Sequence, residues 1–123
     1  MTNKFYYKDG TTSSIYDNSK VLHRTDGPAA EYGSGTKAWY IDGKQHRIDG
    51  PAIEWYNGDR HWFVDHKRHR LDGPAAMYSN GARCWYVDDQ VYCEKKFNKL
   101  MKAIRQLPLA LRLIDPREWV RKL

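Results

Sequence analysis

The stretch His46-Arg47-Ile48-Asp49-Gly50-Pro51-Ala52 decides the fold, because the pattern His-Arg-x-Asp-Gly-Pro-Ala occurs three times in this chain. It begins at His23, His46 and His69, which gives a 23-residue period. Three tryptophans keep the same period, namely Trp39, Trp62 and Trp85. A fixed period of this length is typical of repeat proteins, in which similar supersecondary units stack side by side.

Each unit contains three dipeptides that are typical of tight turns. In the second unit they are Asn57-Gly58, Asp65-His66 and Asp72-Gly73. Asn-Gly and Asp-Gly between apolar residues predict two-residue hairpin loops, because a type I′ turn needs positive φ at both central positions. Asp65-His66 and Asp88-Asp89 are weaker signals of the same turn. Trp and Tyr, which favour strands, fill the segments between the turns, so the sequence predicts antiparallel β-hairpins.

Two-residue turns would also fix the register of the strands. They place Trp39 opposite His46 and Ile53 opposite Trp62, and opposed residues share a face. The predicted core face carries the row Ala30, Trp39, His46, Ile53, Trp62, His69, Ala76, Trp85 and Tyr92. The same face is predicted to hold Pro28, Tyr32, Ile41, Ile48, Trp55, Val64, Leu71, Tyr78 and Val87.

The opposite face would then combine aromatic rings with charged groups, again at the 23-residue spacing. Such a mixture is typical of protein recognition surfaces. Alternatively, the aromatic residues pack under a neighbouring element and the charged groups only face solvent. We predict that the partner-binding residues are Tyr40, Arg47, Glu54, Phe63, Arg70 and Tyr86.

The prolines of the repeated motif limit the sheet, because proline cannot donate a ladder hydrogen bond. Pro28, Pro51 and Pro74 must each stand just past a turn or at an edge. We therefore expect stacked hairpins, with the motif as a connector between them.

The chain divides into a β array over residues 1–93 and a helical tail over residues 94–123. Residues 1–22 read as a degenerate N-terminal cap, followed by units 23–45, 46–68 and 69–93. In the tail, apolar residues follow a helical period at Phe97, Leu100, Met101, Ile104 and Leu107. Asp115-Pro116 predicts the start of a further short helix over 116–123. These helices are expected to cover the last repeat; alternatively, they dimerise or dock on a partner.

All of the excess positive charge lies in the tail. Residues 1–93 hold 12 Lys and Arg against 12 Asp and Glu, whereas residues 94–123 hold 9 against 3. An alternative function is therefore nucleic-acid binding through the tail, although a solvated helix face explains the same charges. The candidate residues are Lys95, Lys96, Lys99, Lys102 and Arg105. A third alternative is a structural component that self-associates, as a dimer or a larger assembly, through strand edges or tail helices.

No constellation in the sequence supports catalysis, a metal ion or a cofactor. His23, His46 and His69 recur in identical settings, which argues for a scaffolding role in which each His stacks on a Trp and each motif Asp accepts backbone N–H bonds. Cys84 and Cys93 fall opposite each other, so a disulfide is geometrically possible, but reduced thiols fit the expected cytoplasmic location. The first residues lack the apolar core of a signal peptide and no run has membrane-spanning length, so we expect the protein to stay in the cytoplasm.

With the repeat laid out, the segment from Trp39 to Ala52 resembles the MORN-like β-hairpin repeats, which also have a 23-residue period. It looks closest to a divergent set with Trp-Tyr-x-x-Gly-x-x-His-Arg-x-Asp-Gly-Pro-Ala, found in tailed-phage, bacterial and giant-virus proteins. The resemblance covers about residues 10–93. The next unit departs from it with Phe63 and His66, and the last ends in Tyr92-Cys93 where His-Arg would stand.

This resemblance implies a scaffold or binding surface and carries over no catalytic residues. By analogy, it implies a phage-encoded inhibitor or adaptor that acts on a host protein, including a defence protein, in the host cytoplasm. Together with the residue patterns, it leads us to expect a mainly β protein with C-terminal α structure: a repetitive antiparallel hairpin array capped by two or three short helices. We expect it to be a protein-binding module rather than an enzyme.

Overall fold

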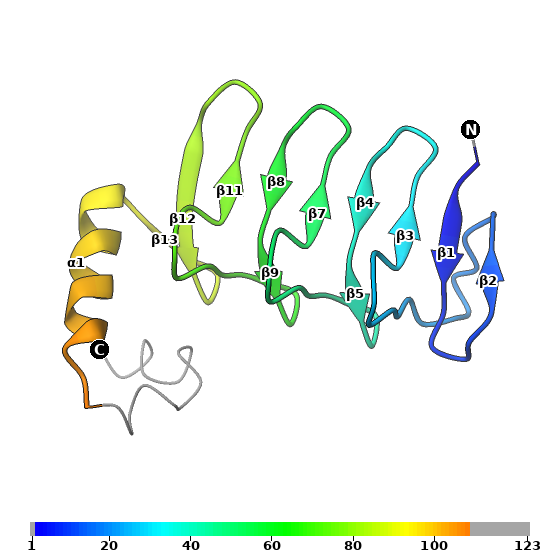
Figure 1. Cartoon of the computed structure of the whole chain (residues 1–123), viewed down its shortest axis with the longest axis horizontal. Coiled ribbons are helices and arrows are strands. Elements are labelled where there is room, and N and C mark those ends of the chain that lie inside the picture. Colours follow the sequence, from blue (N-terminus) through cyan, green and yellow to red (C-terminus); the bar gives the residue numbers. More distant parts are fainter. Residues whose placement is uncertain (1, 109–123) are drawn as a thin grey trace.

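The computed structural model describes residues 2–108 of the chain, which form a long row of β-hairpins with one helix at its end (Figure 1). The helix is α1 (Glu94–Arg105). The strands are β1 (Lys4–Tyr6), β2 (Thr12–Ser13), β3 (Ala30–Glu31), β4 (Lys37–Ala38), β5 (Tyr40–Ile41), β6 (Lys44–Gln45), β7 (Ile53–Glu54), β8 (Arg60–His61), β9 (Phe63–Val64), β10 (Lys67–Arg68), β11 (Ala76–Met77), β12 (Arg83–Val87) and β13 (Gln90–Tyr92).

Nine of the strands form one antiparallel sheet in the order β13-β12-β11-β8-β7-β4-β3-β1-β2. Strands β3, β7 and β11 begin at Ala30, Ile53 and Ala76, so the structure keeps the period of the sequence. Each unit has a tip hairpin, such as β7–β8, and a base hairpin, such as β9–β10, at its other end (Figure 1). The prediction of a mainly β, antiparallel meander with a C-terminal helix is confirmed.

The base hairpins close through the two-residue turns that the sequence predicts. Asp42, Asp65 and Asp88 have φ of 51°, 50° and 50°, and the following residue in each turn also has positive φ. The backbone N–H of His46 donates to the carbonyl of Trp39 at 3.1 Å, which is the predicted pairing across the first of these turns. The weaker turn signals at Asp65-His66 and Asp88-Asp89 therefore marked real turns.

The tip hairpins have three-residue loops, and here the predicted register was wrong by one residue. Ile53 pairs with His61, not with Trp62, across the loop of residues 56–58. The N–H of Gly58 donates to the carbonyl of Trp55 at 3.0 Å, and Gly58 takes the positive φ of 97°. A type I turn followed by glycine in the left-handed region is the usual form of a three-residue hairpin loop, and it uses Asn-Gly differently from a two-residue turn.

Because side chains alternate along a strand, this shift of one residue exchanges the two faces of β4, β8 and β12, while β3, β7 and β11 keep the predicted orientation. One face, which we call the aromatic face, carries the row Phe5, Ala30, Ala38, Ile53, His61, Ala76 and Cys84. The opposite, charged face carries the row Lys4, Glu31, Lys37, Glu54, Arg60, Met77 and Arg83. Trp39 follows Lys37 onto the charged face and is not in the core row. Ile48, also predicted to be core, is 78% exposed.

Residues 46–52 lie outside the strands, as the prolines predict, and form the connector between units. The Arg47 guanidinium lies 3.9 Å from the centre of the Trp39 ring. It donates from Nε to Asp49 Oδ1 at 3.1 Å and from Nη1 to the Pro51 carbonyl at 3.0 Å. Arg24 and Arg70 donate to the equivalent Asp and Pro residues of their units. The motif therefore builds a folded connector whose aspartate accepts from arginine, not from the backbone as expected.

The motif histidines hold neighbouring units together. Nδ1 of His46 accepts the N–H of Asp65 at 3.0 Å, in the base turn of the next hairpin. His23 and His69 accept the N–H groups of Asp42 and Asp88 in the same way, at 3.0 and 3.1 Å. This is a scaffolding geometry, although the expected stacking of His46 on Trp39 is not among the ring contacts of residues 2–108.

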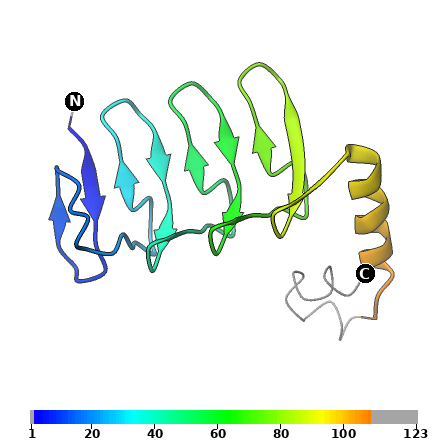
Figure 2. The ribbon, with the colours of Figure 1, turned by 180° about the vertical axis from the view of Figure 1, so that it is seen from behind.

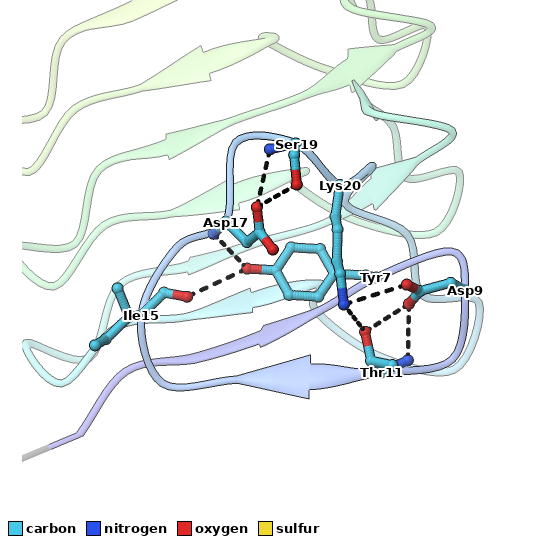
Figure 3. Close-up of polar contacts among 7 residues, drawn as sticks. All are labelled: Tyr7, Asp9, Thr11, Ile15, Asp17, Ser19 and Lys20. Carbon is cyan, nitrogen blue, oxygen red and sulfur yellow. Dashed lines mark hydrogen bonds and ion pairs between the residues drawn. The ribbon is translucent and has the colours of Figure 1, made fainter.

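The N-terminal end of the array is closed by a loop that folds back on Tyr7 (Figure 3). The Tyr7 hydroxyl accepts the N–H of Asp17 at 2.8 Å, and its ring lies under the Lys20 ammonium. The Thr11 hydroxyl donates a hydrogen bond to Asp9 Oδ1. Asp9 also forms an ion pair with Lys20, whose Nζ is 3.3 Å from Oδ2 of Asp9. Beside this loop, β2 is the edge strand of the sheet.

At the other end of the array, α1 lies beside the last hairpin (Figure 2). Its apolar stripe packs on that hairpin. Phe97, Met101 and Ile104 are buried with Val87, and Leu100, Trp85 and Tyr92 pack around them. The helix begins after Cys93, which is exposed, while Cys84 is half-buried; both thiols are free. Only this one helix occurs within residues 2–108, and the second helix predicted over 116–123 lies outside that range.

Candidate protein-binding surface

Two rows of aromatic residues run along the aromatic face, one on each side of the central row of small residues. Two positions after Ala30, Ile53 and Ala76, toward the hairpin tips, stand Tyr32, Trp55 and Tyr78. Two positions after Ala38, His61 and Cys84, toward the base, stand Tyr40, Phe63 and Tyr86. Because alternate residues of a strand share a face, both rows lie on the side of Ala30 and Ala38.

Ring contacts fix the positions of these aromatic side chains. The Tyr32 ring meets Phe5 edge-on, with centroids 5.6 Å apart, and Tyr40 packs against the same buried cluster. Burial raises the pKa of the Tyr32 phenol, and the neighbouring phenols of Tyr40 and Tyr16 act in the same direction. The rings are thus held in place by edge-to-face packing rather than left free in solvent.

A groove lies between the two rows where the central residues are small. We call it the aromatic groove; its volume is about 390 Å³ and it is lined by Tyr32, Ser34, Thr36, Ala38, Tyr40, Gln45, Ile53, Trp55 and Tyr56. An adjoining hollow of about 580 Å³ shares Tyr32 and Tyr40 and extends to Phe5, Tyr16 and Leu22. The rims are open, since Tyr32, Trp55 and Tyr56 are 39%, 42% and 71% exposed.

None of the nine residues that line the aromatic groove carries a charge. The neighbouring unit has His61 in the position of Ala38, and its ring lies 6.4 Å from Trp55, 6.4 Å from Phe63 and 5.4 Å from Tyr78. Burial lowers the pKa of His61, and the nearby Arg68 lowers it further while Asp59 opposes the shift. Burial therefore favours the neutral form of the imidazole. Past His61, the Arg68 guanidinium lies 5.6 Å from the centre of the Phe63 ring and 5.3 Å from that of Tyr86.

Side chains also tie the hairpin tips together and fix the pitch of the aromatic rows. Each link runs from a side-chain oxygen to a backbone N–H of the next tip. The pairs are Asn3 Oδ1 with Gly33 N at 2.8 Å, Thr36 Oγ1 with Tyr56 N at 3.0 Å, and Asp59 Oδ1 with Ser79 N at 2.7 Å. The N–H of Ser79 is the main reason that the pKa of Asp59 is lowered. Asn3, Thr36 and Asp59 were missed in the sequence, although Thr36 and Asp59 keep the 23-residue spacing.

The six predicted partner-binding residues do not share one face. Tyr40 and Phe63 lie on the aromatic face, and Tyr86 follows Cys84 there. Arg47 and Glu54 lie on the charged face, with Arg47 Nη1 3.7 Å from Glu54 Oε1. The Arg70 guanidinium lies 4.0 Å from the centre of the Trp62 ring, as Arg47 does over Trp39. The prediction of a mixed aromatic and arginine stripe was wrong, because the three-residue tip loops place the arginines with the tryptophans.

The charged face has a larger hollow, of about 740 Å³, between the second and third connectors. Arg47, Trp62 and Arg70 line it, and each of these arginines already bonds an aspartate and a proline carbonyl of its own connector. Ile48 stands at its edge. The guanidinium groups of Arg47 and Arg70 already form hydrogen bonds within their own connectors. We therefore place the candidate site on the aromatic face.

The predicted tail cations Lys95, Lys96, Lys99, Lys102 and Arg105 are all exposed on α1, away from its buried stripe. None of the five forms an ion pair with another residue of the range 2–108. Within that range, no His, Cys, Asp and Glu side chains cluster in a way that could hold a metal ion. The same range has no helix with the length and apolar character needed to cross a membrane.

Comparisons with protein-family models, with curated proteins and with solved structures give no match to this chain.

Proposed function

We propose that this protein is a non-enzymatic binding module that recognises a protein partner through the aromatic face. The observation that carries the proposal is the row of exposed Tyr and Trp rings, Tyr32, Trp55 and Tyr56, around a groove floored by Ala38 and Ile53. Tyr and Trp dominate the energetics of protein interfaces because their large rigid rings bury much apolar area at little cost in side-chain entropy.

The packing of the face supports this proposal in a second way. The side-chain links between hairpin tips hold the aromatic rows at a fixed pitch, so a partner would meet a preorganised surface. Preorganisation lowers the entropic cost of binding. The predicted residues Tyr40, Phe63 and Tyr86 belong to this surface, whereas Arg47, Glu54 and Arg70 are satisfied within the scaffold and are left out of it.

The test is affinity capture from a cell lysate, with and without nuclease, using the wild-type chain and the double variant Tyr32→Ala/Trp55→Ala. We expect a protein to be retained in the presence of nuclease and lost with the double variant. The matched control is Ile48→Ala, because Ile48 is exposed in the same unit but lies in the connector beside the charged face. Capture of the same amount of the partner protein by both variants and the wild type would contradict the proposal.

A second candidate function is nucleic-acid binding through α1. The five exposed cations Lys95, Lys96, Lys99, Lys102 and Arg105 support it, since none is neutralised by a described neighbour. It predicts an affinity for DNA or RNA that falls steeply with salt concentration. A variant with all five residues changed to Gln should not bind nucleic acid. Binding that ignores salt concentration would rule it out.

The resemblance to MORN-like repeats extends the main proposal to a biological role. On that analogy the partner is a host protein, and the protein is a phage-encoded inhibitor or adaptor that acts in the cytoplasm. Identification of the captured partner by mass spectrometry tests this role directly, because a partner of another kind would contradict it.

A further inference from the structure

Two hollows on the charged face are copies of one site. The smaller one, of about 540 Å³, lies between the first and second connectors, and the hollow of about 740 Å³ follows it between the second and third. All eight residues that line the smaller hollow have their equivalent, 23 positions later, in the lining of the larger one. Thr25, Trp39 and Ile48, for example, correspond to Ile48, Trp62 and Leu71. We call the two copies the first and second connector hollows.

A third copy of the site follows one unit later, and there α1 closes it. A fourth connector would begin at Tyr92, but α1 begins at Glu94 and takes its place at the end of the row (Figure 1). The residues of the array that pack with the apolar stripe of α1 are Leu71, Trp85, Val87 and Tyr92. They stand 23 positions after four residues that line the second connector hollow, which are Ile48, Trp62, Val64 and His69. The third copy is thus filled by the apolar side chains of a helix.

The positions that α1 covers in the third copy are open in the second. Val87 is fully buried, whereas its equivalent Val64 is only partly buried. Ile48 is 78% exposed, although its equivalent Leu71 is partly buried against the cluster that α1 forms. Leu71 also lines the second connector hollow, so the packed interface of α1 and the open hollow are continuous. The second hollow therefore offers a ligand the same apolar surface that α1 covers one unit later.

The charged groups at the rims of the hollows determine which polar groups a ligand should carry. The side chains of Asp26, Asp49 and Asp72 are between 82% and 87% exposed. Those of Arg47 and Arg70 are only 23% and 21% exposed, because each lies over a tryptophan ring of its own unit. A ligand at the rim therefore meets carboxylates, and complementary charge favours Lys and Arg on the ligand.

We propose that the second connector hollow binds a basic amphipathic α-helix of a partner protein, whose large apolar side chains enter the hollow as those of α1 fill the third copy. Helices commonly bind grooves through apolar residues at i, i+3, i+4 and i+7. The stripe of α1 has this spacing, and most of its other residues are Lys or Arg. The first hollow is the weaker copy, because Thr25 stands there in the place of Ile48. The inference goes beyond the proposed function, since it concerns the opposite face and a second partner.

The experiment measures binding of a probe peptide to the full chain by calorimetry. The probe has the sequence of residues 94–107, acetylated and amidated, and we call it the α1 peptide. The control peptide has the same composition, but Phe97 is exchanged with Lys95 and Ile104 with Lys102, which breaks the apolar stripe. We expect one α1 peptide to bind per chain and the control peptide to bind at least tenfold more weakly.

Variants of the full chain locate the site. Ile48→Asn should weaken the α1 peptide at least tenfold, because it puts a polar amide in the hollow in place of an apolar side chain. Asp49→Asn keeps an acceptor for Arg47 but removes the charge, so it should weaken the peptide about threefold at low salt and reduce the salt dependence. The matched control is Tyr56→Asn, since Tyr56 is 71% exposed but lies on the aromatic face, and it should leave the affinity unchanged. Circular dichroism verifies the fold of each variant.

Two results would overturn the inference directly. One is equal affinity for the α1 peptide and the control peptide. The other is binding that a folded Ile48→Asn variant does not weaken, since the peptide would then bind elsewhere on the chain, such as at the seat of α1 itself.

Other results would contradict the partner helix by naming another occupant. Self-association of the chain that Ile48→Asn abolishes would make a second copy the occupant. Peptide binding only to the full chain with Leu111→Asp/Trp119→Asp would make the C-terminal segment the occupant. In the lysate capture, a protein bound at the hollow is lost with Ile48→Asn and retained with Tyr32→Ala/Trp55→Ala. This inference and the proposed function can therefore fail separately.

Discussion

The guanidinium of Arg47 occupies the space that a side chain on Gly50 would need. A Cβ on Gly50 would stand 2.9 Å from the Cζ atom of Arg47, and the same distance recurs between Arg24 and Gly27 and between Arg70 and Gly73. The glycine of the motif is therefore required by the arginine three residues earlier, and not by its own backbone, because the φ of Gly50 is not positive.

This relationship predicts a coupled pair of substitutions. Gly50→Ala should lower the free energy of unfolding by about 1–2 kcal/mol, because the new methyl displaces Arg47 from Trp39 and from the Pro51 carbonyl. In an Arg47→Ala background the same change should cost less than about 0.5 kcal/mol, since the space is then empty. Urea denaturation of the four proteins measures the coupling, and additive effects would contradict the explanation.

The hydrogen bond from the Asp65 N–H to Nδ1 of His46 should also be measurable. His46→Ala should lower the free energy of unfolding by about 1 kcal/mol, as for a typical net hydrogen bond. His46→Asn places an acceptor oxygen near the former Nδ1 and should recover part of the loss. The readout is the urea midpoint of each variant; equal midpoints for the Ala and Asn variants would show that ring packing, not the hydrogen bond, matters at this position.

The base turns predict a stabilising substitution. His66 has a φ of 68°, a conformation that costs an L-residue roughly 1 kcal/mol relative to glycine. His66→Gly should raise the thermal midpoint by a few degrees. The matched control is Gly43→Ala at the equivalent position, where φ is 76° and a Cβ would stand 3.3 Å from Val21 Cγ1. That variant should be destabilised; the same sign of change in both proteins would be inconsistent with the turn geometry.

His61 should make the stability of the protein depend on pH. Its pKa is lowered in the folded state by burial, so the unfolded chain binds more protons as the pH falls below about 6.5. Stability should therefore be highest above that pH and should decline as the pH falls through the lowered pKa. Urea midpoints between pH 7.5 and 5 should fall less in His61→Ala than in the wild type, because the other histidines remain in both. An identical decline of the urea midpoint in both proteins would show that groups other than His61 cause the pH dependence.

Much of the architecture could be predicted because it depends on local patterns. The 23-residue period placed the units, and the turns at Asp42-Gly43 and Asp65-His66 formed as their residue types predict. The apolar spacing of Phe97, Met101 and Ile104 identified the buried stripe of α1. Each of these features is set by residues close together in the chain.

The register of the tip hairpins could not be taken from Asn57-Gly58 alone, since glycine serves both two-residue and three-residue loops. One available signal would have decided it. Only the three-residue loops bring Glu54 opposite both Lys37 and Arg60, so opposite charges pair across the strands. With the other register, Tyr40, Phe63 and Tyr86 were assigned to the face opposite Tyr32, Trp55 and Tyr78, so the two aromatic rows were separated.

The contacts between units also restrict how this chain can change in length. Asp59 accepts the N–H of Ser79 and His46 accepts the N–H of Asp65, so each of these two bonds links one unit to its immediate neighbour. Duplication or deletion of a 23-residue segment would restore each of these partners, whereas any other insertion would separate donors from acceptors at the junction. Genetic recombination that preserves the fold is therefore confined to whole units, each of which would lengthen the molecule by about 9.6 Å.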